Sequence, residues 1–427
     1  MTVEFGFTEE LVNTQYAPLA ALFVRYQQEQ TLQPLENVQI LGKVRDFSSL
    51  DKLTQLFVSI LAGCDTLSEV NPRLGSEMAL AEVWGWTRFA EQSNLSRLLD
   101  QLTLKQLDNL RAATTQIWRN HSQTMKHDWR GYLWLDYDLS GLPCGVQAEA
   151  SQKGYFSDKT NVSGRQLARV SVVKYRETIW SDVFPGNYHT VHCLQPAVQA
   201  AGNALELALS QRDRVVWRLD GGSGSEQKMR WLVGQGYQLL AKGMNHNRTM
   251  TLARQVQRWD TYGEAWVAEV PAPQDYARPV RVFVKRRWKD GEFQYCYYVT
   301  TLSLPSKGNF LAFYDARGGA EVEQFRNDKS GLSLATRRKH DYLGQVGYIL
   351  LTDLAHNLLA DFYHRALVES RFKDYGLKRI VRDLLATPGR LIFDEQNHLQ
   401  RIELLSQKQY AEELLICLEK YCSGSRL

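Results

Sequence analysis

The segment GYLWLDYDLSGL, residues 131–142, places apolar side chains on both sides of two carboxylates. This pattern is typical of a strand that is buried on both faces of a sheet. After it, RQLARVSVVKYRETIWSDVFPG (165–186) predicts a hairpin of two strands, and VHCLQPAVQAAGNALELALSQ (191–211) predicts a helix. DRVVWRLDGGSGSEQ (213–227) is a strand that enters a glycine loop, and WLVGQGYQLLAKGM (231–244) is a helix or turn followed by a strand. The order predicts an α/β core with an antiparallel start and one helical crossover.

The region before this core is helical by its apolar spacing. LDKLTQLFVSILAGC (50–64) and LKQLDNLRAATTQIWRNH (104–121) both place apolar residues three and four apart. Between them, Ser93 or Asn94 is a candidate cap for a helix that carries Arg97 in its first turn or two. A short helix, a turn and a second helix with an early arginine fit a helix-turn-helix DNA reader. A plain helical hairpin fits the same pattern equally well.

The region after the core alternates strongly between apolar and polar residues. In RPVRVFVKRRWKDGEFQYCYYVTTL (278–302), Asp290 and Gly291 separate two strand-like runs, which indicates a hairpin. We therefore expect a β-rich insertion over residues 250–312. From residue 321 the chain turns helical again, and RLIFDEQNHLQRIEL (390–404) predicts a two-stranded return near the end.

Composition places few limits on function. A length of 427 residues favours several domains, and a net charge of +4 permits a polyanionic partner without requiring one. Six scattered cysteines without a C-x-x-C pair are typical of free thiols in a reducing compartment. The apolar stretch VGYILLTDLAHNLLADFY (346–363) carries Asp353, His356, Asn357 and Asp361, so it predicts a buried core helix rather than a membrane span. We expect a soluble, cytoplasmic protein with no membrane partner.

Two aspartates stand where strands of an α/β sheet end. Asp138 lies at the end of the first core strand, and Asp220 follows RVVWRL and precedes Gly221 and Gly222. Ligands of open α/β sheets bind just outside such strand ends, and glycines let a backbone approach a ligand closely. Converging carboxylates repel each other, and a divalent cation removes that penalty. Oxygen-rich acidic sites suit Mg²⁺ or Mn²⁺, and two such ions can flank a transferring phosphoryl group.

The segment YDARGGAE (314–321) spaces three polar residues at intervals of three and four. On a helix, Tyr314, Arg317 and Glu321 would share one face. Glu323 would point sideways from that face, although it competes with Glu321 as a candidate acid.

The succession of strand aspartate, strand aspartate, β-rich insertion and Tyr-Arg-Glu helix resembles a known family. The chain resembles bacterial insertion-sequence DDE transposases, whose ribonuclease H-like catalytic core is interrupted by a β-rich insertion and carries a Tyr-Arg-Glu-Lys signature. The matching stretches are LWLDYDLSGLPCG, WRLDGGSGS, YDARGGAEVEQFRNDKSGLSLATRRKH and LLTDLAHNLL. The resemblance runs from about residue 84 to the C-terminus.

The resemblance implies a metal-binding triad of Asp138, Asp220 and Glu321, holding Mg²⁺ or Mn²⁺, two ions in all. Asp136 shares a strand face with Asp138 and stays open as an alternative, although the family pattern of an acid two residues before Ser or Thr favours Asp138. The signature lysine would be Lys329, which stands one residue later than the usual spacing.

The resemblance also implies where DNA would bind. The candidate contacts are the signature residues, the two basic runs KRRWK and ATRRKH and the early arginine of the N-terminal helix: Tyr314, Arg317, Lys329, Lys285, Arg286, Arg287, Trp288, Arg337, Arg338, Lys339 and Arg97. For each basic run the alternative is a solvated face without a ligand. Arginine and lysine contacts to phosphate give an affinity that falls steeply with salt.

The complete hypothesis is a DDE transposase that hydrolyses the phosphodiester at the ends of an insertion sequence and joins them to target DNA. It predicts a helical DNA-binding region over 1–128, the core over 129–249 and 313–372, the β-rich insertion over 250–312 and a helical C-terminal region over 373–427. The expected partners are double-stranded DNA and a second copy of the chain, in a bacterial, nucleoid-associated setting. A metal-dependent nuclease without strand transfer and a catalytically silent DNA-binding descendant remain alternatives.

Overall fold

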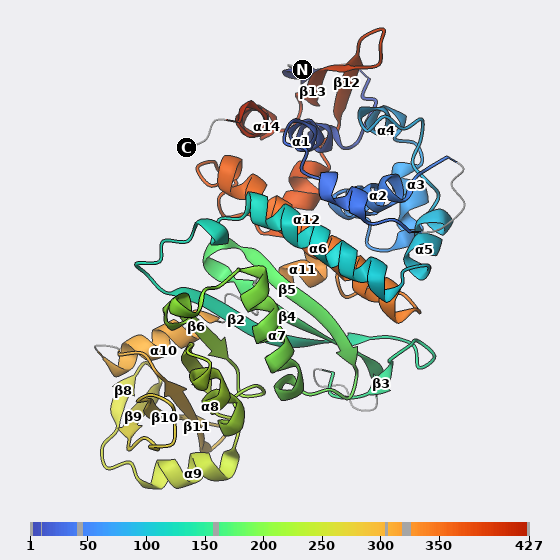
Figure 1. Ribbon diagram of the computed structural model, residues 1–427. Coiled ribbons are helices and arrows are strands. Elements are labelled where there is room, and N and C mark those ends of the chain that lie inside the picture. The colour runs from blue at the N-terminus through green and yellow to red at the C-terminus, as the bar shows by residue number, and fades with distance from the viewer. Residues whose placement is uncertain are drawn as a thin grey trace. The chain divides into compact units, whose positions relative to one another are not determined.

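The chain folds into two compact units in a computed structural model, which describes residues 3–9, 11–40, 46–156, 162–303, 306–317 and 326–424. Unit 1 comprises Met1–Gln123, Gln147–Glu149 and Phe325–Leu427, and unit 2 comprises Thr124–Val146 and Ala150–Gln324. The region predicted as C-terminal therefore packs together with the N-terminal helices. Figure 1 labels helices and strands of both units.

Unit 2 is built on a large mixed sheet that begins in the predicted order. Its first three long strands are antiparallel neighbours: β2 (Leu133–Pro143), β4 (Ser163–Val172) and β5 (Glu177–Pro185). Helix α7 (Thr190–Ala204) then leads to β6 (Val215–Leu219), which pairs in parallel with β2. Helix α8 (Glu226–Gly234) leads to β7 (Gln238–Lys242), which pairs in parallel with β6. The predicted α/β core with an antiparallel start is confirmed.

The strands predicted as a β-rich insertion continue this sheet. After α9 (His246–Arg254) they are β8 (Asp260–Tyr262), β9 (Ala265–Val270), β10 (Arg281–Lys289) and β11 (Glu292–Thr300). β11 pairs antiparallel with β7, so the sheet runs β3-β4-β2-β6-β7-β11-β10-β9-β8, with β3 at Gln152–Lys153 and β5 beside β4. The alternation of 278–302 correctly predicted strands, but it gave no information on pairing, and these strands extend the core sheet instead of folding apart from it.

The turn between β10 and β11 explains the predicted hairpin. Asp290 and Gly291 have φ angles of 54° and 85°. A two-residue type I′ turn requires positive φ at both central residues, and Asp-Gly accepts that conformation readily. The turn sets the register, so that Lys289 pairs with Glu292 and Trp288 with Phe293.

Helices cover both faces of the sheet near its centre (Figure 1). On one face the Tyr137 hydroxyl donates to the Thr190 carbonyl at the start of α7, over a distance of 2.9 Å. On the other face α10 (Lys307–Asp315) buries Phe310 and Leu311 against side chains of β6, β7, β9, β10 and β11. The Phe310 ring stacks on Phe283 of β10 at 4.0 Å. These contacts anchor α10 on the face of the sheet opposite α7. Its C-terminal end lies over the side chains of β2 and β6 that point to that face.

Unit 1 is mainly helical, with a small sheet. Its helices are α1 (Ala17–Gln28), α2 (Ser49–Leu61), α3 (Val70–Leu74), α4 (Met78–Val83), α5 (Gln92–Asp100), α6 (Leu104–His121), α11 (Arg326–Gly331), α12 (Tyr342–Phe362), α13 (Leu377–Arg379) and α14 (Ala411–Ser423). β12 (Gly389–Phe393) and β13 (Leu399–Leu405) form the predicted two-stranded return, and β1 (Glu4–Thr8) joins it in parallel with β13. Helix α12 is buried from Gly344 to Phe362, as expected of a core helix. Within the described ranges, no helix has the length and apolar character that crossing a bilayer requires.

Helix α5 begins earlier than its sequence suggests. Its first residue is Gln92 and its N-cap is Glu91, whose side chain makes no capping hydrogen bond. Ser93 and Asn94 therefore lie inside the helix, and the predicted cap is wrong. Instead the Asn71 side chain accepts a hydrogen bond from the Gln92 backbone N–H at 2.8 Å, so a residue distant in sequence supplies the capping oxygen. Arg97 remains exposed, with its guanidinium 3.2 Å from the Asn94 side-chain oxygen.

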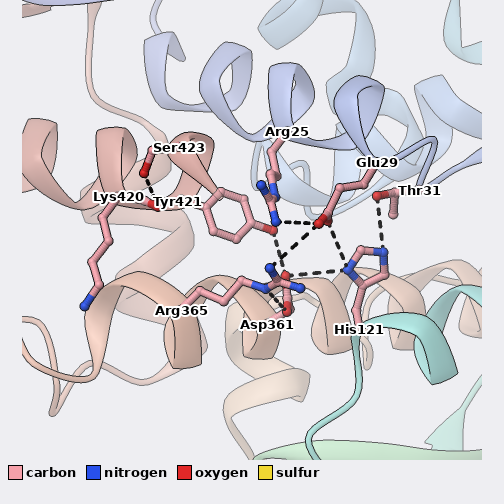
Figure 2. A network of polar contacts seen from close by, with 9 residues as sticks. All are labelled: Arg25, Glu29, Thr31, His121, Asp361, Arg365, Lys420, Tyr421 and Ser423. Atoms are coloured by element: carbon pink, nitrogen blue, oxygen red, sulfur yellow. Dashed lines mark hydrogen bonds and ion pairs between the residues drawn. The ribbon is translucent and has the colours of Figure 1, made fainter. Parts of the chain in front are cut away.

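A buried polar network joins four helices of unit 1 (Figure 2). Asp361 of α12 accepts a hydrogen bond from Tyr421 of α14 at 3.0 Å and forms an ion pair with Arg365 at 2.6 Å. His121, the last residue of α6, contacts the Thr31 hydroxyl at 3.2 Å, and its Nδ1 lies 3.6 Å from Glu29 and 3.8 Å from Asp361. The network ties the first helix of the chain to the last one.

This network predicts a loss of stability in acid. Burial lowers the pKa of His121, although Asp361 and Glu29 act in the opposite direction and Arg365 and Arg25 add to the lowering. The unfolded chain then binds the proton first, so the free energy of unfolding falls once the pH drops below the ordinary histidine pKa of about 6.5. Between pH 7 and pH 5.5, wild type should lose more stability than His121→Gln in denaturant titrations. Equal losses would show that His121 is not the group that titrates.

Candidate active site

Asp220 directly follows the last residue of β6, as predicted, but Asp138 lies inside β2, which continues to Pro143, so the prediction that Asp138 ends its strand is wrong. Leu133 to Tyr137 of β2 pair in sequence with Val215 to Leu219 of β6, so Asp138 and Asp220 come next on each strand. Neighbouring strands lie about 4.8 Å apart, which places these half-buried residues side by side at the edge where the parallel pairing of β2 with β6 ends. The next strand adds Lys242, because Leu219 pairs with Ala241 and Lys242 follows it. The edge therefore presents two acids and a lysine in a row.

The loop after β6 holds Asp220 in place. The Asp220 Oδ1 atom accepts hydrogen bonds from the Ser223 backbone N–H at 2.9 Å and from its hydroxyl at 2.8 Å. A β-carbon on Gly222 would stand 3.2 Å from Oδ2 and 3.1 Å from the Thr190 hydroxyl oxygen. A glycine at this position therefore keeps the space beside the Asp220 carboxylate open.

Gly224 predicts a mutational effect in this loop. A β-carbon there would stand 1.8 Å from the Lys242 carbonyl oxygen, which no real side chain tolerates, so Gly224→Ala must displace the loop or the end of β7. We expect a loss of about 2 kcal/mol or more in the free energy of unfolding. Gly221→Ala is the matched control, because its β-carbon would meet Lys242 only at 3.7 Å. Equal denaturation midpoints for the two variants would contradict the close approach of the two backbones at Gly224.

Asp136 is bound to Arg218 rather than open to a ligand. Both residues are buried, at 3% and 5% exposure, and face each other across β2 and β6. Arg218 donates from Nε and Nη2 to the two carboxylate oxygens at 2.6 and 2.5 Å, and from Nη1 to the Phe313 carbonyl at 2.9 Å. Burial raises the pKa of the Asp136 carboxyl, and Arg218 and Arg317 act against that shift. With both oxygens occupied, Asp136 links β2, β6 and α10.

Tyr314 and Arg317 come to the same face of the sheet at the end of α10. The helix ends at Asp315, so Arg317 lies beyond the C-cap residue Ala316 and does not share a continuous helix with Tyr314 as predicted. The two are nevertheless neighbours, since the Arg317 guanidinium lies 6.0 Å from the centre of the Tyr314 ring. Burial raises the pKa of Tyr314 to about 12, with Arg317 lowering it and Asp220 raising it further. The hydrogen bond from Arg218 to the Phe313 carbonyl brings this end of α10 to β6, close to Asp136, the other partner of Arg218.

The remaining signature residues are not among the described residues of unit 2. Glu321 and its competitor Glu323 lie outside the described residues. Lys329 belongs to α11 of unit 1, whereas Tyr314 and Arg317 belong to unit 2. These three assignments stay predictions. In the described ranges no group of three or more His, Cys, Asp or Glu residues gathers into a metal-like cluster.

Strand geometry divides the basic run KRRWK between two faces of β10. Arg286 is enclosed by aromatic rings, with its guanidinium 4.3 Å from the Trp259 ring centre and 4.6 Å from that of Phe293. Trp288 points to the same side and is 57% exposed. Lys285 and Arg287 lie on the opposite face, where Arg287 donates to the Gln294 side chain at 3.3 Å. Four neighbouring residues in the sequence therefore do not form one continuous DNA surface.

Two of the three basic residues in the second run are buried. Arg337 is 2% exposed and donates to the Tyr348 hydroxyl and to the carbonyls of Leu332 and Cys64. Lys339 is 8% exposed and forms an ion pair with Asp100 at 2.6 Å. Their charges are occupied inside unit 1, so the expectation that they face DNA is not met. Arg338 is exposed, as predicted for a DNA contact.

Arg338 and His340 line a pocket of about 280 Å³ together with hydroxyl side chains of Thr66, Ser68, Ser96 and Thr336. Ser96 precedes Arg97 on α5, so the structure brings the predicted reading helix and the exposed part of ATRRKH together. Cationic and hydroxyl groups of this kind are typical ligands of phosphate oxygens.

Sequence reasoning missed Lys242 and Arg218. Both stand on predicted strands, in AKGM and RVVWRLD, and their polar side chains in apolar runs were the available signal. Recognising their role required strand register, because Arg218 matters as the partner of Asp136 and Lys242 as the neighbour of Asp220.

Comparisons with known proteins place this geometry in a wider context. No protein-family model matches the chain, and no curated protein matches its sequence. Among solved structures, the fold is similar to that of piggyBac transposase, as seen by cryo-EM in its synaptic complex with hairpin DNA. The TM-score is 0.50 at 12% sequence identity, and the similarity covers 87% of this chain and 80% of the other. Identity this low carries information on fold and not on activity; the chain thus has a mixed α/β fold similar to that of a transposase.

Proposed function

We propose that the protein is a DDE transposase that cuts and joins DNA ends at the edge of its unit 2 sheet. The observation that carries the proposal is the placement of Asp138 and Asp220 side by side where the parallel pairing of β2 with β6 ends, with Tyr314 and Arg317 at the end of α10 over the same face. The sheet order β5-β4-β2-β6-β7, antiparallel and then parallel, supports a ribonuclease H-like core. The transposase fold of the solved neighbour supports the same interpretation.

The residues at this edge suit a divalent cation. Asp138 and Asp220 supply carboxylate oxygens, which Mg²⁺ and Mn²⁺ prefer, and Gly222 leaves the Asp220 carboxylate accessible. Glu321 would complete the set. Bound ions would supply neutralisation of charge on the phosphate and a lower pKa for water at the site. Without them the adjacent aspartates repel each other, so the site is built for an occupied state.

The remaining groups at the edge are suited to holding a DNA strand. Lys242 adds a positive charge beside Asp220, and Arg317 has a planar guanidinium suited to two hydrogen bonds with phosphate, although its side chain is only 4% exposed in this structure. Both favour an in-line geometry at the scissile phosphate. The reaction is hydrolysis of the phosphodiester at the element boundary, which frees a 3′-hydroxyl. That hydroxyl then attacks a phosphodiester of the target DNA and displaces the 3′-oxygen of the target strand, so no covalent enzyme intermediate forms.

DNA binding away from the edge would use exposed groups. In unit 1, Arg97 and Arg338 are exposed and stay our candidates, together with Lys329. In unit 2 the candidates are Lys285, Arg287 and Trp288. Pairing two DNA ends calls for a homodimer on DNA. The proposed setting is the cytoplasm of a bacterium, at the nucleoid, with an insertion sequence as the substrate.

The test is a cleavage and joining assay on DNA that carries the sequences flanking the gene. Purified protein, Mg²⁺ and a labelled flanking fragment should yield cuts at the element boundary, and a supplied target plasmid should acquire the cut ends. EDTA should abolish both products. Cuts without joining would favour a metal-dependent nuclease over a transposase. Binding of the flanking DNA without any cut in Mg²⁺ or Mn²⁺ would favour a catalytically silent DNA-binding protein.

A further inference from the structure

A second pocket in unit 1 differs in character from the basic groups discussed so far. It has a volume of about 380 Å³ and is lined by residues of α1, of the segment 30–36, of α2 and of the segment after α4. Four of its side chains are aromatic, namely Phe23, Tyr26, Trp84 and Trp86, and two are carboxylates, Glu36 and Asp51. The other lining residues are uncharged, and none of the lining residues is Lys or Arg.

The aromatic walls are fixed in place. Phe23 stacks on Trp84 with ring centres 3.4 Å apart, and Trp84 stacks on Trp86 at 5.4 Å with planes 7° apart. The Trp86 indole N–H donates to the Asp51 carboxylate at 2.9 Å. A wall that is already ordered loses little entropy when a ligand arrives. Aromatic faces carry negative electrostatic potential, so such a wall attracts cations.

The carboxylates strengthen that attraction. Burial alone would raise the pKa of Asp51, but hydrogen bonds from Ser48 and Trp86 hold it below its ordinary value, so this side chain is ionised at neutral pH. Glu36 is exposed at the pocket. The pocket thus joins two acids to four rings in a protein with a net charge of +4. Nucleic acid is excluded as its occupant, because phosphate would meet negative charge here.

We propose that this pocket binds an organic cation with an alkylammonium head group. Its methyl or methylene carbons pack against the indole and phenyl rings, and its charge lies toward Glu36 and Asp51. A bare metal ion is a poor alternative, since the aromatic walls offer no oxygen ligands. The pocket lies wholly within unit 1 and involves none of the residues at the edge that carries Asp138 and Asp220, so this inference is independent of the proposed function.

The test uses choline and its neutral isostere 3,3-dimethylbutan-1-ol, titrated into the full-length protein by isothermal calorimetry. Both compounds have the same shape and differ in charge. We expect choline to bind at least about tenfold more tightly, because only the cation gains from the rings and carboxylates. Butylammonium should also bind more tightly than the alcohol, since the site recognises the charge and the attached carbons.

Two variants locate the binding. Glu36→Gln should weaken choline severalfold and leave the alcohol unchanged, whereas Glu412→Gln, an exposed acid on α14 outside the pocket, should affect neither. Trp86→Leu should weaken choline binding by at least about tenfold. A thermal melt checks that Trp86→Leu is folded. If it is not, the choline affinity of Glu36→Gln alone tests the proposal. Equal affinities for choline and the alcohol, or choline binding that is unaffected by Glu36→Gln, would overturn the proposal.

Discussion

Asp220→Asn is expected to lower Mg²⁺-dependent cleavage of the flanking DNA by at least about a thousandfold, or about 4 kcal/mol in the activation barrier. The reason is the loss of one negative charge and one ligand at the point where the transferred phosphate must be stabilised. The substitution preserves shape, and the amide oxygen can still accept the hydrogen bonds from Ser223. Single-turnover cleavage with excess protein measures the effect.

The controls separate chemistry from binding and folding. DNA affinity, followed by a mobility shift in the presence of Ca²⁺, should stay within a few-fold of wild type, because phosphate contacts depend on exposed cations elsewhere. The free energy of unfolding should change little or rise slightly, since one member of a repelling pair is neutralised. A cleavage rate within tenfold of wild type would remove Asp220 from the active site.

Asp136→Ala should give the largest loss of stability of any single substitution at this edge, about 3–5 kcal/mol in the free energy of unfolding. The substitution leaves the Arg218 guanidinium buried without the carboxylate that binds two of its nitrogens, and so weakens the link between β2, β6 and α10. Guanidinium titration of wild type and variant measures the difference.

Asp138→Asn is the matched comparison, two residues along the same strand face. It should keep wild-type stability within about 1 kcal/mol and lose cleavage to the extent that Asp220→Asn does. The two aspartates thus predict opposite phenotypes, one structural and one catalytic. A stable Asp136→Ala variant without cleavage, together with an active Asp138→Asn variant, would reverse the assignment.

Most of the secondary structure could be predicted from the sequence because local patterns determine it. The alternation and apolar runs of 131–186, the Asp290-Gly291 turn and the apolar spacing of α2, α6 and α12 each depend on residues close together in the chain. The succession of elements also predicted Asp220 at the end of its strand, whereas β2 continues five residues beyond Asp138, which its apolar pattern did not reveal. The position of Asp220 was therefore accessible without coordinates.

The predictions that failed concern features set by contacts between segments that are distant in the sequence. The cap of α5 comes from Asn71, twenty-one residues before Gln92. Arg337 is held by carbonyls of Leu332 and Cys64, and Arg286 by Trp259 and Phe293, so basic residues that resemble a DNA surface in the sequence are partly structural. The pairing of β11 with β7 converted a predicted insertion into part of the core sheet. The charge of a residue and the polar–apolar alternation around it indicate which interactions it could make. Which partner it has depends on the tertiary structure.

The central proposal is that Asp138 and Asp220 would bind a divalent ion, and iron-mediated cleavage of the polypeptide tests it most directly. Fe²⁺ in place of Mg²⁺, with ascorbate and peroxide, generates radicals that cut the backbone near the bound ion. We predict cuts close to residues 138 and 220, suppressed by excess Mg²⁺ and lost in Asp220→Asn. Cuts elsewhere only, or an unchanged pattern in that variant, would contradict the account.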